Sequence, residues 1–337
     1  MSVIYFHIGP HKTGTTSIQS FLDANREWLH SLGFSYPTYL LSEPFHDFHS
    51  LFMEYDKNFD NWFNQFKELR YAYSIISSET FFNRTFSKQK KSIFDSLRSL
   101  SDIKLIGVLC LRPQDELIHS QWAQAVKHGE LDICLRDYVE LCLANKLEVL
   151  NGGRSTDWFI YPKYSTIISD VQDYFDEIKI FVHSKDHSET LRRFLTCLEI
   201  NITKDTINEL KRPFKQNITP SYKTLEYVRT IISQLNTKFS TEERKVIAQM
   251  IKREASLRGF NNSIKYGYDK ELIKSIRQHF EYDNQIINRE LSPDFHINWR
   301  LDKFESGHQL VDEYELNQVH VALLNRLKNK QAFNISG

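Results

Sequence analysis

Two short stretches of the chain combine residue types that bind anions. The first is Gly9-Pro10-His11-Lys12-Thr13-Gly14-Thr15-Thr16-Ser17. A glycine-containing loop between a strand and a helix presents backbone N–H groups and a helix N-terminus to one point. The Lys12 ammonium adds a mobile positive charge, and the hydroxyl groups of Thr15, Thr16 and Ser17 add further donors. We therefore predict that this loop binds a phosphate-like anion.

The second stretch is Leu111-Arg112-Pro113-Gln114-Asp115-Glu116-Leu117-Ile118-His119-Ser120. Arg112 stands where a predicted strand ends, and Ser120 follows about two helical turns later. Both side chains can therefore reach a ligand beyond the carboxyl end of that strand. A bidentate guanidinium group together with a hydroxyl group suits a phosphate monoester.

The first loop differs from the Walker A loop, in which lysine follows the second glycine. Here Lys12 precedes Gly14, and a threonine follows the glycine. The order Lys-Thr-Gly-Thr-Thr-Ser resembles the 5′-phosphosulfate loop of sulfotransferases, which use 3′-phosphoadenosine 5′-phosphosulfate (PAPS). The stretch from Arg112 to Ser120 resembles the 3′-phosphate motif of the same family. The resemblance, to bacterial-type soluble enzymes that sulfate carbohydrates, extends more weakly to about residue 200.

This resemblance implies a site and a reaction. Residues 11–17 would hold the 5′-phosphosulfate, and Arg112 and Ser120 would hold the 3′-phosphate. The sulfuryl group would pass in line, without a metal ion, to a hydroxyl or amine group of an acceptor, which we expect to be a carbohydrate or glycolipid. PAP would be released, and Lys12 would neutralise the charge that grows on the leaving phosphate.

The identity of the catalytic base is open between two residues. Glu79 directly follows a predicted strand, and some carbohydrate sulfotransferases use a glutamate near an equivalent strand end. His49 is the second choice, because histidine is the base in other branches of the family. His11 and His119 rank below both. A solvent-exposed glutamate that caps the next segment is an equally simple interpretation of Glu79.

Two other function classes remain open. One is a P-loop nucleotide kinase or NTPase. Two features disfavour it: Lys12 is displaced from the Walker A position, and the predicted strand ends in Arg112 rather than in an aspartate. The other is a catalytically inactive nucleotide-binding module. The presence of Lys12 and Arg112 counts against it. We predict no metal site, because the pair His46 and His49 lacks a third ligand. The basic residues Lys211, Arg212 and Lys215 either close over a nucleotide or form a solvated charge cluster.

The elements that must position these residues follow an alternating pattern. Apolar runs predict strands at 2–8, 73–78, 102–112 and 178–182, and a helix is expected from about Gly14 to Gly33. Alternation of strands and helices predicts a parallel sheet with right-handed crossovers. After about residue 200 only helices are indicated, over 222–235, 241–257, 269–289 and 311–327. We expect an α/β, P-loop-type three-layer fold with a helical C-terminal third, divided into a PAPS-binding core (1–210) and an extension (211–337).

Composition excludes several other classes of protein. The 337 residues are 41% hydrophobic and 26% charged, which is enough for a packed core. Lys+Arg and Asp+Glu both number 43, so nothing indicates a nucleic-acid partner. No apolar run approaches the ~20 residues of a membrane span. We expect a cytoplasmic protein with four reduced, buried cysteines; the sequence does not indicate the acceptor's identity or the oligomeric state.

Overall fold

The computed structural model describes residues 2–36, 55–68, 71–82, 87–151, 160–210, 220–234, 239–260 and 267–291, together with 293, 296–297, 299, 315, 317–319 and 321–322. The chain forms two compact units that alternate along the sequence. The first unit comprises Met1–Pro113, Asp157–Gln216 and Phe280–Asn298. The second comprises Gln114–Thr156, Asn217–His279 and Trp299–Gly337.

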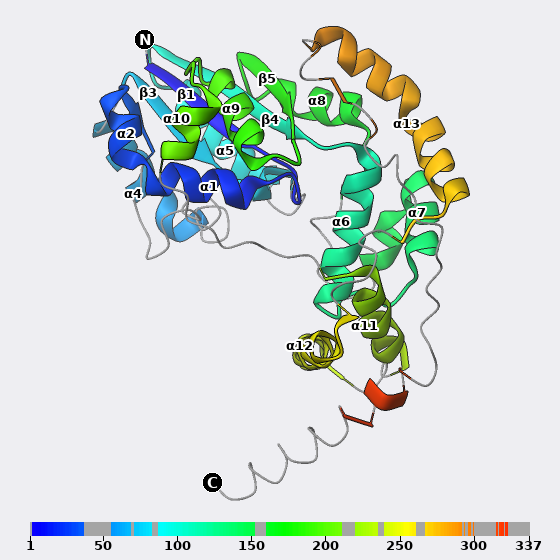
Figure 1. Cartoon of the computed structure of the whole chain (residues 1–337). Helices are drawn as coiled ribbons and strands as arrows, with labels where there is room; N and C mark the ends of the chain where they lie inside the picture. Colours follow the sequence, from blue (N-terminus) through cyan, green and yellow to red (C-terminus); the bar gives the residue numbers. More distant parts are fainter. Residues whose placement is uncertain are drawn as a thin grey trace, which may run out of the picture. The chain divides into compact units, whose positions relative to one another are not determined.

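The first unit is built on a parallel sheet of five strands (Figure 1). Its strands are β1 (Ser2–Ile8), β2 (Phe34–Ser35), β3 (Tyr73–Ser77), β4 (Ile103–Leu111) and β5 (Glu177–Val182). They lie in the order β2-β3-β1-β4-β5, with β1 between β3 and β4. The four predicted strands are confirmed, whereas the two-residue β2 was not predicted because so short a strand has no periodicity to detect.

Helices cover both faces of this sheet. Tyr5, Ile106 and Val108 belong to one core cluster, which also contains residues of α1 (Thr15–Ala24), α2 (Arg26–Ser31), α9 (His187–Cys197) and α10 (Lys204–Glu209). Phe6 points the opposite way and contacts Phe94 of α5 (Ser87–Arg98), with the ring centroids 4.9 Å apart. Successive residues of β1 are therefore buried on opposite faces, which explains its continuous apolar sequence. The predicted α/β three-layer architecture is confirmed.

The single helix predicted after the first loop is interrupted at Asn25. This residue ends α1 and begins α2, with φ −118°. Its side-chain amide donates to the Phe21 carbonyl at 2.8 Å, and its backbone N–H also donates to that carbonyl, at 3.1 Å. Asparagine competes in this way for backbone partners, which disfavours it inside a helix.

The remaining helices of the first unit are α4 (Tyr55–Glu68), the 3-10 helix η1 (Glu79–Phe82), α8 (Tyr164–Gln172) and the end of α13 (Lys270–Glu290). The second unit contains α6 (Gln114–Lys127), α7 (Leu135–Leu143), η3 (Leu147–Asn151), α11 (Tyr222–Gln234), α12 (Thr241–Leu257) and the start of α13. The predicted helices at 222–235, 241–257 and 269–289 are confirmed to within one residue. Of the helix predicted at 311–327, only six residues are described, and all six are helical.

The cysteines depart from expectation at one position. Cys110, Cys142 and Cys197 are buried, and all four thiols are free of disulfide bonds. The prediction of a buried thiol is wrong for Cys134, which is partly exposed. Its sulfur accepts the Asp137 N–H at 3.4 Å and so caps the start of α7. Among the described helices, none is long and apolar enough to cross a membrane.

Candidate functional site

The predicted anion-binding loop connects β1 to α1 and turns sharply at two residues. Lys12 has φ 72° and Gly14 has φ 90°, so both have left-handed backbone conformations. A non-glycine residue at positive φ is uncommon, and Lys12 therefore marks a constrained turn. Left-handed residues within a tight turn direct successive N–H groups toward one point, which makes a concavity suited to an anion.

Contacts within the loop and with β4 hold this conformation. The Thr13 hydroxyl donates to the Pro10 carbonyl at 2.7 Å, and the Cys110 thiol of β4 donates to the Thr13 carbonyl at 3.2 Å. Burial raises the pKa of Cys110 well above its ordinary value, so this sulfur keeps its proton and remains a donor. A Cβ atom at Gly9 would lie 2.5 Å from the Thr15 methyl group. Only glycine therefore fits at the start of the loop.

The N-terminus of α1 opens onto the same loop. Gly14 is its N-cap residue and, having no side chain, makes no side-chain cap hydrogen bond. The first turn contains no acidic residue. The partial positive charge of the helix N-terminus is therefore not offset within the helix and favours an anion at this position.

Glu79 lies beside the loop, as the position of its strand predicted. It starts η1 two residues after β3 ends, and β3 pairs with β1. Its Oε2 accepts the Thr15 hydroxyl at 2.8 Å and lies 3.6 Å from His11 Nδ1. The Glu79 side chain is 24% exposed. A carboxylate that is held in place and still accessible has the geometry required of a general base.

A buried histidine lies beneath these residues. His7 of β1 is 1% exposed, and its Nδ1 is 2.8 Å from the Ser77 hydroxyl at the end of β3. Burial lowers the pKa of His7 to about 3, although nearby Glu79 acts in the opposite direction. The imidazole is therefore neutral near pH 7 and joins β1 to the strand that precedes Glu79.

Arg112 directly follows β4, and its guanidinium reaches the anion-binding loop. Arg112 Nη1 donates to the Lys12 carbonyl at 2.8 Å, across 100 positions of sequence. This hydrogen bond joins the two predicted anion-binding motifs at the carboxyl ends of adjacent strands. Parallel α/β sheets bind their ligands at this edge.

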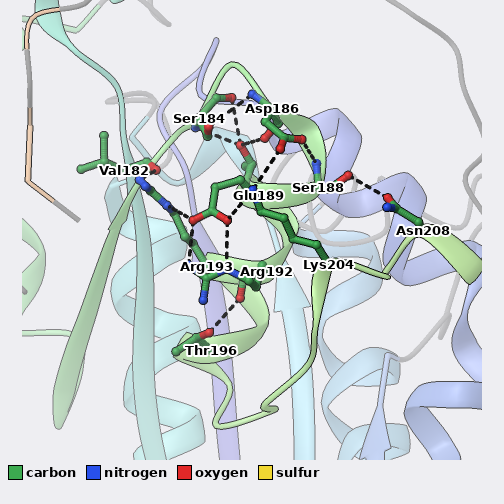
Figure 2. A network of polar contacts seen from close by, with 11 residues as sticks. Val182, Ser184, Asp186, Ser188, Glu189, Arg192, Arg193, Thr196, Lys204 and Asn208 are labelled. Carbon is green, nitrogen blue, oxygen red and sulfur yellow. Dashed lines mark hydrogen bonds and ion pairs between the residues drawn. The ribbon is translucent and has the colours of Figure 1, made fainter. Parts of the chain in front are cut away.

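The turn after β5 contributes His183 to the same edge. A Cβ atom on Gly14 would lie 3.0 Å from His183 Cδ2, so the imidazole lies against the start of α1. Figure 2 shows the polar network that holds this turn. Arg193 donates to the Val182 carbonyl at 2.9 Å, and Thr190 Oγ1 accepts the Ser184 N–H at 2.9 Å. The residues on both sides of His183 are thus tied to α9.

Glu189 is the centre of that network (Figure 2). It accepts hydrogen bonds from Arg192, at 2.7 and 2.9 Å, and from Arg193, at 2.8 Å. The hydrogen bonds from Arg192, followed by the one from Arg193, lower the pKa of Glu189 to about 2. Glu189 is therefore ionised at neutral pH and fixes the arginine that binds the end of β5.

The structure brings together most of the predicted site residues but not all of them. His11, Lys12, Thr13, Gly14, Thr15, Glu79 and Arg112 lie at one edge of the sheet. Thr16 is exposed in the first turn of α1, and Ser17 is half-buried one residue later.

The other predicted residues either belong to the second unit or lie outside the described residues. Ser120 is buried in α6 and belongs to the second unit, so its partnership with Arg112 stays a prediction. His49 lies outside the described residues, as do Lys211, Arg212 and Lys215. His119 is also buried in α6 of the second unit.

Sequence reasoning missed His7 and His183. His183 follows β5 as Arg112 follows β4, so the rule that identified Arg112 could have found it. His7 could have been recognised as a polar residue within a buried apolar strand. Over the described part of the chain, no three His, Cys, Asp or Glu side chains are grouped so that they could hold a metal ion.

No protein-family model matches this chain, and no curated protein matches it. Among solved structures, the chain is similar to the crystal structure of a sulfotransferase from Alicyclobacillus acidocaldarius. The two share 15% sequence identity over 63% of this chain and 85% of that chain, with a TM-score of 0.40. A similarity at this level assigns no role to any residue, so the functional argument depends on the geometry above.

Proposed function

We propose that this protein is a cytoplasmic sulfotransferase that moves the sulfuryl group of PAPS to a hydroxyl or amine group of a carbohydrate or glycolipid acceptor. The observation that carries the proposal is the 2.8 Å hydrogen bond from Arg112 to the Lys12 carbonyl. It joins a phosphosulfate-type loop to an arginine suited to a second phosphate. A nucleotide with phosphate groups at both the 3′ and the 5′ position of its ribose would engage both motifs.

The loop would stabilise the leaving group. In sulfuryl transfer, as in phosphoryl transfer, the acceptor oxygen attacks in line and negative charge grows on the departing oxygen. The Lys12 ammonium and the N–H groups at the start of α1 would neutralise that charge. Preorganised donors of this kind are effective because they need little reorganisation during the reaction.

Glu79 is our proposed base. Its Oε2 is held by the Thr15 hydroxyl and lies near His11, while a quarter of the side chain is accessible. A carboxylate that is held beside the loop and still accessible would take the proton of an acceptor hydroxyl group. His49 remains the alternative base.

One observation favours a second candidate function, a magnesium-dependent nucleotide kinase. A threonine hydroxyl group at a helix start and a carboxylate at a neighbouring strand end, here Thr15 and Glu79, are also suitable oxygen ligands for a phosphate-bound Mg²⁺. The position of Lys12 before Gly14 counts against this function, because the Walker A lysine follows the second glycine.

A thermal-shift titration separates the two functions. The protein is titrated with PAP, and with ADP and ATP in the presence and absence of Mg²⁺. We expect PAP to stabilise it without Mg²⁺, by about 2.7 kcal/mol at a concentration 100 times the dissociation constant. We further expect Arg112→Ala to weaken PAP binding by about 10- to 100-fold, since hydrogen bonds to charged groups are the strong ones.

The outcomes are distinct. Stabilisation by Mg²⁺ with ATP, and none by PAP, would favour the kinase. Stabilisation by no nucleotide would overturn both functions. PAP binding without transfer of sulfate from PAPS to any member of a glycan panel would support an inactive nucleotide-binding module.

A further inference from the structure

The backbone of Arg112 is held by Tyr164, which is held in turn by Asp283, and both residues lie far along the chain in the first unit. Sheet pairing of β4 ends at Leu111, which faces Val182 and accepts the His183 N–H at 2.7 Å. Arg112 comes next, before Pro113, which has no N–H to donate. A backbone leaving a sheet in this way needs other partners for its polar groups, because buried groups without partners are costly.

A single hydroxyl group provides both partners. Tyr164 Oη donates to the Arg112 carbonyl and accepts the Arg112 N–H at 3.3 Å. Tyr164 is fully buried, so this hydroxyl group is held by its surroundings. Tyr164 thus provides the hydrogen bonds that a paired strand would otherwise provide. It fixes the backbone from which the Arg112 guanidinium extends.

Tyr164 is itself fixed by a residue of α13. It is the first residue of α8, whose N-cap residue, Lys163, makes no side-chain cap hydrogen bond. The Asp283 carboxylate accepts the Tyr164 N–H at 2.6 Å and the Ser165 N–H at 3.1 Å. Asp283 is 5% exposed. A carboxylate at a helix N-terminus satisfies its N–H groups and complements its dipole.

We infer that Tyr164 and Asp283 are positioning residues for Arg112 and thereby determine selectivity for a ligand with a 3′-phosphate. Asp283 accepts hydrogen bonds from the start of α8, Tyr164 Oη binds the Arg112 backbone, and the Arg112 guanidinium donates to the Lys12 carbonyl. The inference rests on the proposed function, in which Arg112 binds that phosphate. It gives α13 a role in the site.

The test compares the affinities of PAP and AMP, which differ only in the 3′-phosphate, by calorimetry. The wild-type protein should prefer PAP by about 10- to 100-fold, the range expected for hydrogen bonds to a charged group. Tyr164→Phe keeps the ring but removes the hydroxyl group, and should reduce that preference by roughly 3- to 10-fold. AMP affinity should change little, whereas a purely structural defect would weaken both ligands alike.

Two controls and a second variant complete the design. Tyr227→Phe is a matched control, because Tyr227 is also fully buried and its hydroxyl group donates to Glu315, in the second unit, at 2.8 Å. Ser240→Ala removes a helix cap from that unit. Both controls should keep the wild-type preference. Asp283→Asn should lower the preference for PAP over AMP, as Tyr164→Phe does. It is the variant to measure if Tyr164→Phe does not fold.

The two hypotheses fail in different ways. A wild-type protein that binds PAP no better than AMP would overturn the proposed function and, with it, this inference. A wild-type preference that survives unchanged in Tyr164→Phe and Asp283→Asn would overturn the inference alone.

Discussion

The ends of β1 and β4 reach the same edge of the sheet but are built in different ways. The loop after β1 is shaped mostly by its own residues, through positive φ at Lys12 and Gly14 and the Thr13 hydrogen bond to Pro10. The end of β4 is held by residues far along the chain. Tyr164 lies 52 positions from Arg112, and Asp283 lies 119 positions beyond Tyr164.

This difference has a functional consequence. The turn after β1 depends mostly on adjacent residues, and the carbonyls of Thr13 and Lys12 also accept hydrogen bonds from Cys110 and Arg112 at one neighbouring strand end. A guanidinium positioned by distant segments depends on the tertiary structure of the whole first unit. We therefore expect substitutions to separate chemistry at the first strand end from ligand selectivity at the second.

Lys12→Ala should have the largest effect on turnover. Removing the ammonium group should lower the rate of sulfuryl transfer by about 10²- to 10³-fold, as loss of one transition-state donor does. The preference for PAP over AMP should persist, because Arg112 binds the Lys12 carbonyl, which the substitution retains. Steady-state kinetics with PAPS and calorimetry measure the two effects.

Lys91→Ala is the control for that prediction, since Lys91 is exposed on α5 and pairs only weakly with Asp95 at 3.0 Å. Lys91→Ala should change neither the rate of sulfuryl transfer nor the preference for PAP over AMP. If Lys12→Ala abolished the preference for PAP as well as turnover, the two strand ends would act as one site, and the contrast between them would be lost.

Glu79→Gln should have the next largest effect. The amide oxygen can still accept the Thr15 hydroxyl hydrogen bond, but it cannot take a proton from an acceptor. Turnover should fall by about 10²-fold, within the range for general base catalysis, while PAP affinity changes little. Full turnover together with normal PAP binding would remove Glu79 from the role and leave His49 as the candidate.

Two closely matched glycine substitutions should have the smallest effect on ligand binding. Gly14 (φ 90°) and Gly33 (φ 83°) have similar backbone conformations, so alanine should cost each about 1–2 kcal/mol of unfolding free energy. A Cβ atom at Gly33 has no neighbour within 4 Å, whereas at Gly14 it meets His183. Only Gly14→Ala should also weaken PAP binding, by roughly fivefold, since small displacements in a site are costly.

Denaturant unfolding and calorimetry of both variants test this expectation. Equal losses of stability with unchanged PAP affinity in both would show that the loop tolerates displacement of His183. The anion-binding site would then be confined to the residues of the loop itself.

The sequence determined the features that depend on local patterns. Near-continuous apolar runs identified β1 and β4, because a strand buried on both faces is apolar at successive positions. The shorter strands β3 and β5 were also predicted. The order of glycine, lysine and threonine identified the loop after β1, whose conformation follows from the residues that form it. Arg112 and Glu79 were identified because each follows a strand, and parallel strands share one carboxyl edge.

Tertiary structure alone decided which side chains meet at that edge and what holds them there. Nothing in the sequence indicates that Tyr164 contacts Arg112 or that Asp283 contacts Tyr164, because hydrogen bonds across 52 and 119 positions arise only after the sheet and helices have packed. The alternation of the two units along the chain has the same origin. Sequence patterns report the neighbours of a residue in the chain, whereas the support of Arg112 depends on its neighbours in space.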